Sequence, residues 1–402
     1  MAFIVQKFGG SSVANKERIE RVAGIIADYY SEGNSLVVVL SAQGDTTDDL
    51  IEKAAEINPN PSRREMDVLL STGEQISIAL MAMALEKIGI PVVSLTGWQI
   101  GMLTDSSYGN ARIIKVRGDR IRRELDKRRV VLVAGFQGIT SFDDITTLGR
   151  GGSDTTAVAI AAALHADLCQ IYTDVDGVYT ADPRKVQGAR KLEEITFDEM
   201  LELASLGAQV LHNRSVEMAK RYNVNMEVLS SFERKPGTKV KEVVKQVEQT
   251  KIAGIAKDTN CARIALVGLA DQPGVAFKVF RVLSKYGINV DIILQSIGRD
   301  GTKDISFTVS RSDVKRAAQA LEEAQESLRF KSISVDDSIA KVSIVGAGMV
   351  NSAGIASQMF EALYEAEVNI SMISTSEIKV SVLVHESQAD RAVQAIHNKF
   401  FT

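Results

Sequence analysis

A lysine followed by two glycines ends the first apolar run of the chain. Lys7 precedes Gly9 and Gly10, and two serines then lead into a helix-like stretch. Glycines let the backbone approach phosphate oxygens, and free amides ahead of a helix bind anions. The lysine adds a positive charge that can follow a transferring phosphoryl group. The P-loop has the opposite order, with its lysine after the glycines, and a tight strand-to-helix turn explains this run equally well.

A second glycine-rich stretch combines an arginine with hydroxyl and carboxylate groups. Residues 148–157 read Leu-Gly-Arg-Gly-Gly-Ser-Asp-Thr-Thr-Ala and open a helix-like run. Ser153, Asp154 or Thr155 can cap that helix, which is the purely structural interpretation. Capping leaves Arg150 unexplained, whereas a guanidinium fork suits a carboxylate substrate. We therefore expect Arg150 to bind a carboxylate and Asp154 to hold the ammonium group of Lys7.

Two further polar groups follow apolar runs. Residues 172–184 are rich in turn-forming residues, so they form either a plain β-turn loop or a nucleotide-binding edge at the carboxyl end of a strand. The hydroxyls of Ser41 and Thr47 and the carboxylate of Glu74 suit an amino-acid substrate, with Glu74 binding its ammonium group. Each of the three also fits a simple helix cap.

Residues 1 to about 230 alternate apolar runs with amphipathic stretches. The apolar runs are nearly continuous in Val, Ile and Leu, which indicates strands buried on both faces of a mostly parallel sheet. We therefore predict an α/β fold, a three-layer αβα domain with a mostly parallel central sheet. The predicted strands are Ile4–Phe8, Leu36–Ser41, Val92–Leu95, Val130–Ala134 and Leu168–Thr173, and the predicted helices are Lys16–Tyr30, Arg63–Ile88, Ile113–Lys127 and Thr155–Ala166.

The last third of the chain contains one pattern twice. Each copy reads as a βαββαβ unit of the ferredoxin-like kind, and the runs at 286–290 and 366–370 correspond closely. In each copy we predict the second strand directly after the first helix, at Asn289–Ile293 and Asn369–Ile373. The second copy is one strand short, and we expect Lys251–Ala256 to complete its sheet. The expected domains are residues 1–235, a linker at 236–250, a first repeat at 263–337, and a second repeat formed by 251–257 and 340–402.

Composition limits the class of protein. A chain of 402 residues with 45% hydrophobic and 24% charged residues is expected to fold into two or three globular domains. A net charge of -4 favours neither nucleic-acid nor membrane-surface binding. We expect no membrane span and no signal peptide. Cys169 and Cys261 lie far apart and the histidines lack ligand spacing, so we predict neither a disulfide framework nor a protein metal site, and a cytoplasmic location.

Taken in order, these stretches resemble the aspartate kinases along essentially the whole chain. The related glutamate 5-kinase, acetylglutamate kinase and UMP kinase families share the amino-acid-kinase fold but lack this combination followed by two repeats, and the repeats resemble ACT domains. One motif departs from the family pattern, because the expected Leu-His-Pro-Arg reads Leu-His-Asn-Arg at 211–214. We interpret this as a local change in a helix start. The resemblance rests on residues 7–12, 73–74, 109–112, 134–138, 146–156 and 174–184.

The resemblance implies phosphoryl transfer from ATP to L-aspartate, giving ADP and 4-phospho-L-aspartate, the first step towards lysine, threonine and methionine by way of diaminopimelate. Lys7 and Asp154 would be the catalytic pair, and Mg²⁺ would bind through the phosphates without a dedicated set of protein ligands. The residues implied for aspartate are Ser41, Thr47, Glu74, Arg150 and Ser153. The residues implied for ATP are Lys7, Gly9, Gly10, Thr173, Asp174, Tyr179, Asp182, Arg184 and Lys191. The attacking carboxylate is already ionised near neutral pH, so no general base is needed.

The repeats resemble those of feedback-inhibited members of the family. This implies lysine, threonine or both as effectors, bound between ACT units of two chains, and hence at least a homodimer. Some relatives also make the ACT half as a separate short subunit from an internal start. The residues implied for effectors are Asp271, Gly274, Val275, Ala276, Asn289, Asp291, Gln295, Ser352, Asn369, Ile370, Ser376 and Glu377. A Pro-Gly turn without a ligand is the plain alternative at 271–276.

Two other functions fit parts of the pattern. One is a kinase of the same fold acting on another amino acid, such as glutamate. The other is a non-catalytic amino-acid sensor in which only the repeats work, although that function predicts damaged phosphate motifs. Here Lys7, Arg150 and Asp154 are all present.

Overall fold

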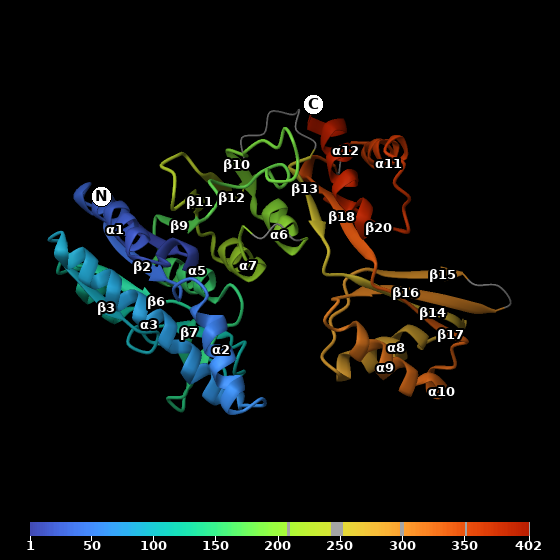
Figure 1. Ribbon diagram of the computed structural model, residues 1–402, viewed down its shortest axis with the longest axis horizontal. Helices are drawn as coiled ribbons and strands as arrows, with labels where there is room; N and C mark the ends of the chain where they lie inside the picture. The colour runs from blue at the N-terminus through green and yellow to red at the C-terminus, as the bar shows by residue number, and fades with distance from the viewer. Residues whose placement is uncertain (207–209, 243–251, 298–300, 350–351, 402) are drawn as a thin grey trace. The chain divides into compact units, whose positions relative to one another are not determined.

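The computed structural model describes the chain except for residues 207–209, 243–251, 298–300, 350–351 and 402 (Figure 1). Its contacts divide the chain into two compact units. The first contains Met1–Tyr179, Lys191–Ser205 and Gln209–Val247. The second contains Thr180–Arg190, Leu206–Ala208 and Glu248–Thr402. The short segment Thr180–Arg190, which we expected in the N-terminal domain, therefore has its contacts in the second unit.

The first unit is built on an eight-stranded sheet in the order β10-β12-β11-β9-β1-β2-β6-β3. Six neighbouring strands from β11 to β3 are parallel to one another, and β12 runs antiparallel to β11. The strands are β1 (Phe3–Phe8), β2 (Ser35–Leu40), β3 (Val92–Leu95), β6 (Val130–Ala134), β9 (Leu168–Thr173), β10 (Glu194–Thr196), β11 (Met226–Ser230) and β12 (Thr238–Lys241). This arrangement confirms the predicted α/β class with a mostly parallel sheet.

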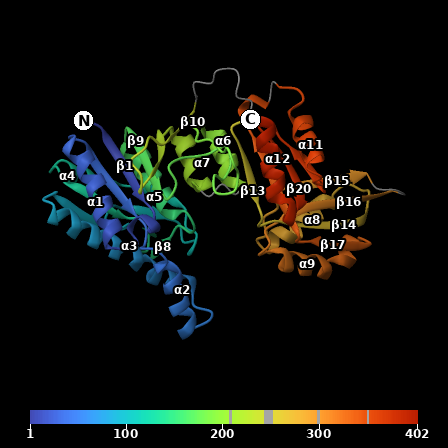
Figure 2. The same cartoon turned by 45° about the horizontal axis from the view of Figure 1, so that its top comes forward.

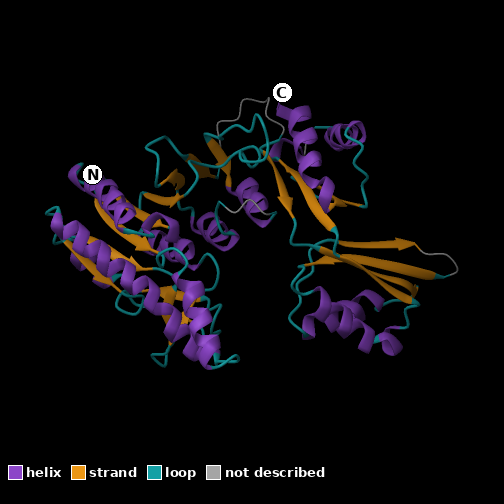
Figure 3. Cartoon of the chain, viewed as in Figure 1, coloured by secondary structure: helices purple, strands orange, loops and turns teal. Residues whose placement is uncertain are grey.

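Helices cover both faces of this sheet (Figure 3). On one face, α1 (Lys16–Ser31) and α3 (Arg63–Lys87) share a core with alternate residues of the strands, such as Phe8 and Leu40. On the other face lie α4 (Asp119–Leu125) and α5 (Gly152–Leu164), with α7 (Asn213–Tyr222) packed on α5 and α6 (Phe197–Ser205) packed on α7. Burial on both faces explains why the strands are apolar at nearly every position.

The remaining helix between β2 and α3, α2 (Thr46–Ile57), packs on α3.

The helix α3 is, by length and composition, the one described helix that could span a membrane. Its buried residues Ile78, Met81 and Leu85 nevertheless lie in the same core as the strands. A core helix of a globular domain passes the same test, and the packing of α3 identifies it as one.

A second, four-stranded sheet of the first unit was missed by sequence reasoning. Its order is β5-β4-β7-β8, from β4 (Met102–Thr104), β5 (Ile113–Val116), β7 (Gln137–Ile139) and β8 (Ile145–Thr147). The helix predicted over 113–127 is therefore wrong in its first part. Ile113, Ile114 and Val116 are β-branched, and such residues favour a strand. Gly118, with φ +71°, is the N-cap of α4, so the helix begins only at Asp119.

The second unit holds two modules of similar build, each a four-stranded antiparallel sheet with two main helices. The first has the order β15-β16-β14-β17 and the second β13-β18-β20-β19. The first contains β14 (Ala262–Ala270), α8 (Val275–Lys285), β15 (Ile293–Ile297), β16 (Thr302–Val309), α9 (Val314–Glu323), α10 (Gln325–Leu328) and β17 (Ser332–Asp336). The second contains β13 (Gly254–Asp258), β18 (Ile339–Val345), α11 (Ile355–Glu365), β19 (Met372–Thr375), β20 (Lys379–His385) and α12 (Ala389–Phe401), visible in Figure 2.

β13 pairs antiparallel with β18, so a strand from before the first repeat does join the sheet of the second. Residue 251, where we expected this strand to begin, lies outside the described residues. The linker prediction at 236–250 is wrong at its start, because Thr238–Lys241 forms β12, and residues 243–250 lie outside the described part. The predicted second strands also begin too early. The strands β15 and β19 start only at Ile293 and Met372. The loops before them contribute Ile288 and Val368 to the hydrophobic cores of the two modules.

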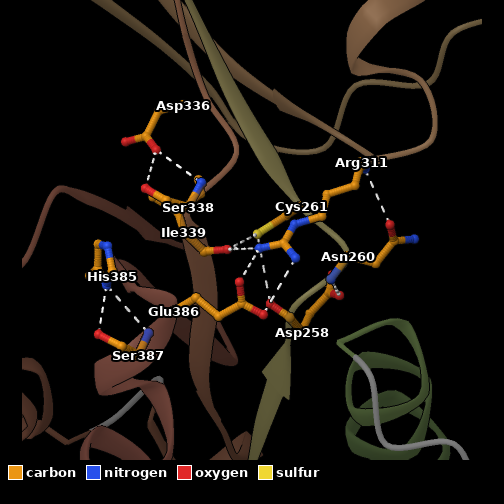
Figure 4. Close-up of polar contacts among 10 residues, drawn as sticks. All are labelled: Asp258, Asn260, Cys261, Arg311, Asp336, Ser338, Ile339, His385, Glu386 and Ser387. Atoms are coloured by element: carbon orange, nitrogen blue, oxygen red, sulfur yellow. Dashed lines mark hydrogen bonds and ion pairs between the residues drawn. The ribbon is translucent and has the colours of Figure 1, made fainter.

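The two modules meet through a small core and a polar cluster (Figure 4). Cys261, Ile292, Ile339, Met372 and Leu383 form the core. Beside it, a guanidinium nitrogen of Arg311 lies 2.6 Å from a carboxylate oxygen of Glu386 and donates to the Ile339 carbonyl at 3.2 Å. Since Arg311 belongs to the first module and Glu386 to the second, this ion pair links them.

Candidate active site

Lys7 and Asp154 form an ion pair where β1 meets the start of α5. Lys7 Nζ lies 2.6 Å from Asp154 Oδ1, and the two side chains are only 12% and 11% exposed. α5 packs across β1, which brings its first turn over the carboxyl end of that strand. A partly buried pair of this kind holds the ammonium group of Lys7 at a fixed position.

The turn before α5 is set by a glycine rather than by a side-chain cap. Gly151 is the N-cap with φ +68°, and within the described residues no side chain caps this helix. A Cβ at Gly151 would lie 2.2 Å from Cγ of His212. The capping interpretation of Ser153 and Asp154 is therefore wrong, and both side chains remain available for other contacts.

These groups line a cavity of about 800 Å³ in the first unit. It brings together residues from β1, the β2–α2 loop and the start of α2, α3, and the β8–α5 loop with the start of α5. All five residues implied for the amino-acid substrate lie in its wall, together with four of the phosphate and catalytic residues. The residues concerned are Ser41, Thr47, Glu74, Arg150 and Ser153, and Lys7, Gly9, Gly10 and Asp154.

Close packing of two loops forms one side of this cavity. Gly10 begins a short 3-10 turn, and a Cβ there would lie 2.7 Å from the Ala42 carbonyl oxygen. The Gly44 amide donates to the Gly10 carbonyl at 3.1 Å. The second glycine of the first motif is thus required for contact between its loop and the loop that carries Ser41.

Glu74 is a buried carboxylate in the cavity wall. Its side chain is 3% exposed, and one oxygen accepts from the Ala42 amide at 3.2 Å. The other oxygen, Oε2, has no hydrogen-bond partner among the described residues. Burial raises the pKa of Glu74 to about 7. A cationic group arriving in the cavity would satisfy this oxygen and favour the ionised form.

Asp67 is a site residue that sequence reasoning missed. It is 1% exposed within α3, and its carboxylate accepts from the amides of Gly109 and Thr147, both at 2.9 Å, and from the Thr147 hydroxyl at 2.7 Å. It thereby fixes two loops of the cavity wall to the helix that carries Glu74. A carboxylate in the second turn of α3, directly before an apolar run, was the available signal. Asn110 and Phe136 of the wall lie in stretches that carry the family resemblance, whereas Tyr108 gave no signal.

Arg214, in the motif that departs from the family pattern, supports the same wall. Its guanidinium donates to the Leu148 carbonyl at 2.8 Å and to the Ala111 carbonyl at 2.6 Å. Asn213 begins α7 where the family pattern has proline. The substitution leaves the arginine free to hold the loop that carries Arg150.

Apart from Lys7, Gly9 and Gly10, the residues implied for ATP do not line this cavity. Thr173 ends β9, and its hydroxyl donates to Asp174 at 3.1 Å. Tyr179 pairs in backbone with Lys191, and both side chains contact Asp176, at 2.6 Å and 3.2 Å. Sequence reasoning did not single out Asp176.

That hydrogen bond to Asp176, with burial, raises the pKa of Tyr179 to about 12. Asp182 and Arg184 belong to the second unit, where Arg184 Nε donates to Asp182 at 3.0 Å.

The residues implied for effectors occupy corresponding turns of the two modules. Gly274, three residues after Asp271, is the N-cap of α8 with φ +88°, and the Asp271 carboxylate pairs with Lys303 at 2.8 Å. Asp291 pairs with the buried Lys341 of the second module. Gln295 lies on the edge strand β15. The remaining members are Val275, Ala276 and Asn289 in the first module and Ser352, Asn369, Ile370, Ser376 and Glu377 in the second.

Comparison with known proteins gives consistent matches over the whole chain. The amino acid kinase family matches residues 2–230, and the ACT domain matches residues 264–325 and 342–400. An aspartokinase of Mycolicibacterium smegmatis is 51% identical, with 100% of this chain and 96% of the relative covered. An aspartate kinase of Pseudomonas putida is 53% identical, with 100% and 98% covered.

Solved structures agree with these matches. Escherichia coli aspartokinase III in complex with aspartate and ADP, in its R-state, has a TM-score of 0.84 at 27% identity, with 100% of both chains covered. The same enzyme in complex with lysine and aspartate, in its T-state, has a TM-score of 0.78 at 26% identity, again over 100% of both chains.

Proposed function

The chain belongs to the aspartokinases, within the amino acid kinase family, and on this premise we propose that it transfers the γ-phosphoryl group of ATP to the side-chain carboxylate of L-aspartate. The products are ADP and 4-phospho-L-aspartate. The observation that carries the proposal is the Lys7–Asp154 pair in the wall of a cavity that also contains Arg150 and Glu74.

The cavity suits a small dicarboxylic amino acid. Arg150 binds one carboxylate of aspartate, and Glu74 binds the α-ammonium group through its otherwise unpaired Oε2. Ser41, Thr47 and Ser153 supply hydroxyl groups for the remaining oxygens. Held in this way, the side-chain carboxylate is presented towards Lys7.

Catalysis consists of positioning and charge neutralisation. The aspartate carboxylate is ionised near neutral pH and attacks the γ-phosphorus in line, so no side chain has to remove a proton. Lys7 neutralises charge on the transferring group, and Asp154 fixes the ammonium of Lys7 for this role. Amides of the loop at Gly9 and Gly10 approach the phosphates.

Mg²⁺ is proposed to bind through the phosphates of ATP and to neutralise part of their charge. Three of the four acidic side chains of the cavity already have partners, because Asp154 pairs with Lys7, and Asp67 and Glu74 accept backbone hydrogen bonds. Among the described residues no group of three or more His, Cys, Asp or Glu side chains is arranged for a metal ion.

ATP is proposed to bind along the carboxyl ends of β1 and β9, where an open parallel sheet binds ligands. Besides Lys7, Gly9 and Gly10, its contacts are assigned to Thr173, Asp174, Tyr179, Asp182, Arg184 and Lys191. The catalytic domain is assigned to residues 1–235 and the ACT domains to 263–337 and to 251–257 with 340–402.

Regulation is proposed to follow from the ACT domains. Lysine, threonine or both bind at the turns that contain Asp271 and Ser352, between two copies of the chain, so the enzyme is at least a dimer. A short ACT-only subunit made from an internal start is proposed as a further partner. The reaction is proposed to open cytoplasmic lysine, threonine and methionine synthesis, with diaminopimelate as an intermediate.

The deciding experiment is a coupled assay of ADP release from ATP with aspartate or glutamate as acceptor. We expect turnover with aspartate and at most a trace with glutamate. Lysine and threonine, added separately and together, should lower the rate. A preference for glutamate would refute the substrate assignment, and a rate unaffected by both amino acids would refute the regulatory one.

A further inference from the structure

The segment between Tyr179 and Lys191 has an unusual position in the fold. These two residues pair in the first unit and are proposed to contact ATP. The intervening Thr180–Arg190 makes its contacts in the second unit. Thr180 and Arg190 continue the same backbone ladder, because the Thr180 amide donates to the Arg190 carbonyl at 2.9 Å. The paired backbone of Tyr179–Thr180 and Arg190–Lys191 therefore forms a short stem. Contacts that fix Thr180–Arg190 also fix Tyr179 and Lys191, the two residues proposed to contact ATP, through this stem.

The second ACT module holds the segment through a buried hydrogen bond to its last helix. The Thr180 hydroxyl accepts from the Arg190 amide at 2.9 Å and lies 3.0 Å from Nε2 of His397 on α12. Thr180 and His397 are 3% and 2% exposed. His397 also stacks on Phe401, with ring centroids 4.8 Å apart. Burial lowers the pKa of His397, so its ring is neutral and pairs with the hydroxyl as a hydrogen-bond partner, without a charge.

Two further contacts fix the same segment. Gln187 and Gln394 are joined twice: the Gln187 amide donates to the Gln394 side-chain oxygen at 2.9 Å, and the Gln394 side-chain nitrogen donates to the Gln187 carbonyl at 3.3 Å. The Ile255 amide of β13 donates to the Thr180 carbonyl at 2.7 Å. Ala181 and Val186 are buried in the hydrophobic core of the second ACT module. A surface loop needs none of these contacts, so the segment is built into this module.

We infer that α12 of the second ACT module is a positioning element for ATP, which acts through the Thr180–His397 and Gln187–Gln394 hydrogen bonds on the stem that ends in Tyr179 and Lys191. The inference rests on the proposed function, because it assumes that ATP contacts this stem. It assigns the positioning residues Thr180, His397 and Gln394, none of which needs to touch the substrate.

Steady-state kinetics of full-length variants without effectors tests the inference. Thr180→Val removes the hydroxyl at nearly constant shape, and Gln394→Ala removes the pair of hydrogen bonds to Gln187 from a half-buried helix position. We expect each to raise KM for ATP about three- to tenfold, the range for loss of one or two hydrogen bonds, with KM for aspartate within about twofold. Thr180→Ser, which keeps the hydroxyl, should restore wild-type values.

Arg391→Ala is the matched control, because Arg391 lies on the same helix and donates to the Glu367 carbonyl, away from the segment. It should leave both KM values unchanged. Unchanged KM for ATP in Thr180→Val and Gln394→Ala would overturn the inference, as would equal changes for both substrates accompanied by a lower Tm. ADP affinity measured by calorimetry should fall by the same factor. The ADP affinity tests the inference even if the wild-type chain does not phosphorylate aspartate. Failure to phosphorylate aspartate would refute the proposed function separately.

Discussion

Lys7 Nζ lies 2.6 Å from Asp154 Oδ1, although the two residues belong to a strand and a helix far apart in the chain. The pair is nearly buried and lies in the wall of the cavity that contains Arg150 and Glu74. The pair therefore fixes the ammonium group of Lys7 beside the proposed acceptor.

The first prediction concerns this pair. Lys7→Ala should lower kcat by about 10²–10³-fold, as expected for loss of a charge aimed at the transition state. Asp154→Asn should also lower kcat, because the ammonium group is no longer held. Both should stay folded by circular dichroism. Lys16→Ala, an exposed lysine at the start of α1, is the control and should keep the wild-type rate. A near-normal kcat for Lys7→Ala would exclude the catalytic assignment.

The second prediction concerns the pH dependence of Glu74. Its pKa is raised to about 7 in the folded chain from 4.5, so ionising it costs stability. In the unliganded enzyme, stability should fall as pH rises from about 4.5 to about 7, and the penalty, up to about 3 kcal/mol, should persist above pH 7. Glu74→Gln should remove this slope and be the more stable protein at pH 8, which denaturant unfolding at pH 5 and pH 8 can show.

Aspartate binding should show the opposite pH trend. Since the α-ammonium group of aspartate needs the ionised Glu74, affinity should fall as pH drops below about 7. Glu74→Gln should bind aspartate weakly at all pH values, and the exposed Glu217→Gln should behave like wild type. Equal aspartate affinity of wild type and Glu74→Gln at pH 8 would rule out this contact.

The third prediction concerns Asp67, whose carboxylate accepts three hydrogen bonds from two loops of the cavity wall. Asp67→Asn replaces one acceptor with a donor, which should destabilise the chain by about 1–3 kcal/mol. KM for aspartate should rise because the wall loosens. Glu65→Gln, at an exposed position of the same helix, provides the comparison. If Asp67→Asn changes neither unfolding nor KM, the proposed support of the wall is wrong.

The fourth prediction separates backbone strain from steric conflict at Gly151. Gly151→Ala places a methyl group 2.2 Å from the His212 ring at a φ of +68°. Gly354→Ala has a similar φ of +89° at the N-cap of α11 but meets no atom within 4 Å. Gly354→Ala should cost about 1–2 kcal/mol from its backbone conformation alone. Gly151→Ala should cost more and abolish activity by displacing Arg150. Similar activities of the two variants would show that the contact with His212 is unimportant.

Much of the fold followed from sequence because its signals are local. Apolar runs of Val, Ile and Leu indicated the parallel strands, and the positions of β1, β3, β6 and β9 agree with them within a residue. Glycines and charged residues at the ends of these strands indicated where the site would form. The repeat at the end of the chain indicated two similar modules.

Other features were decided only by tertiary structure. The sheet of β4, β5, β7 and β8 is made of strands too short for a reliable pattern. Asp67 became recognisable as part of the site only when α3 met the loops at Gly109 and Thr147.

The sequence by itself determined the family, the two kinds of domain and the residues that carry charge to the site, because these depend on residue types in order. Tertiary structure brought the expected partners Lys7 and Asp154 to within 2.6 Å of each other, and it decided that Gly151 rather than a side chain caps α5. It also decided that Thr180–Arg190 is held by the second ACT module. Each of these depends on contacts between segments distant in the chain, which no local pattern encodes.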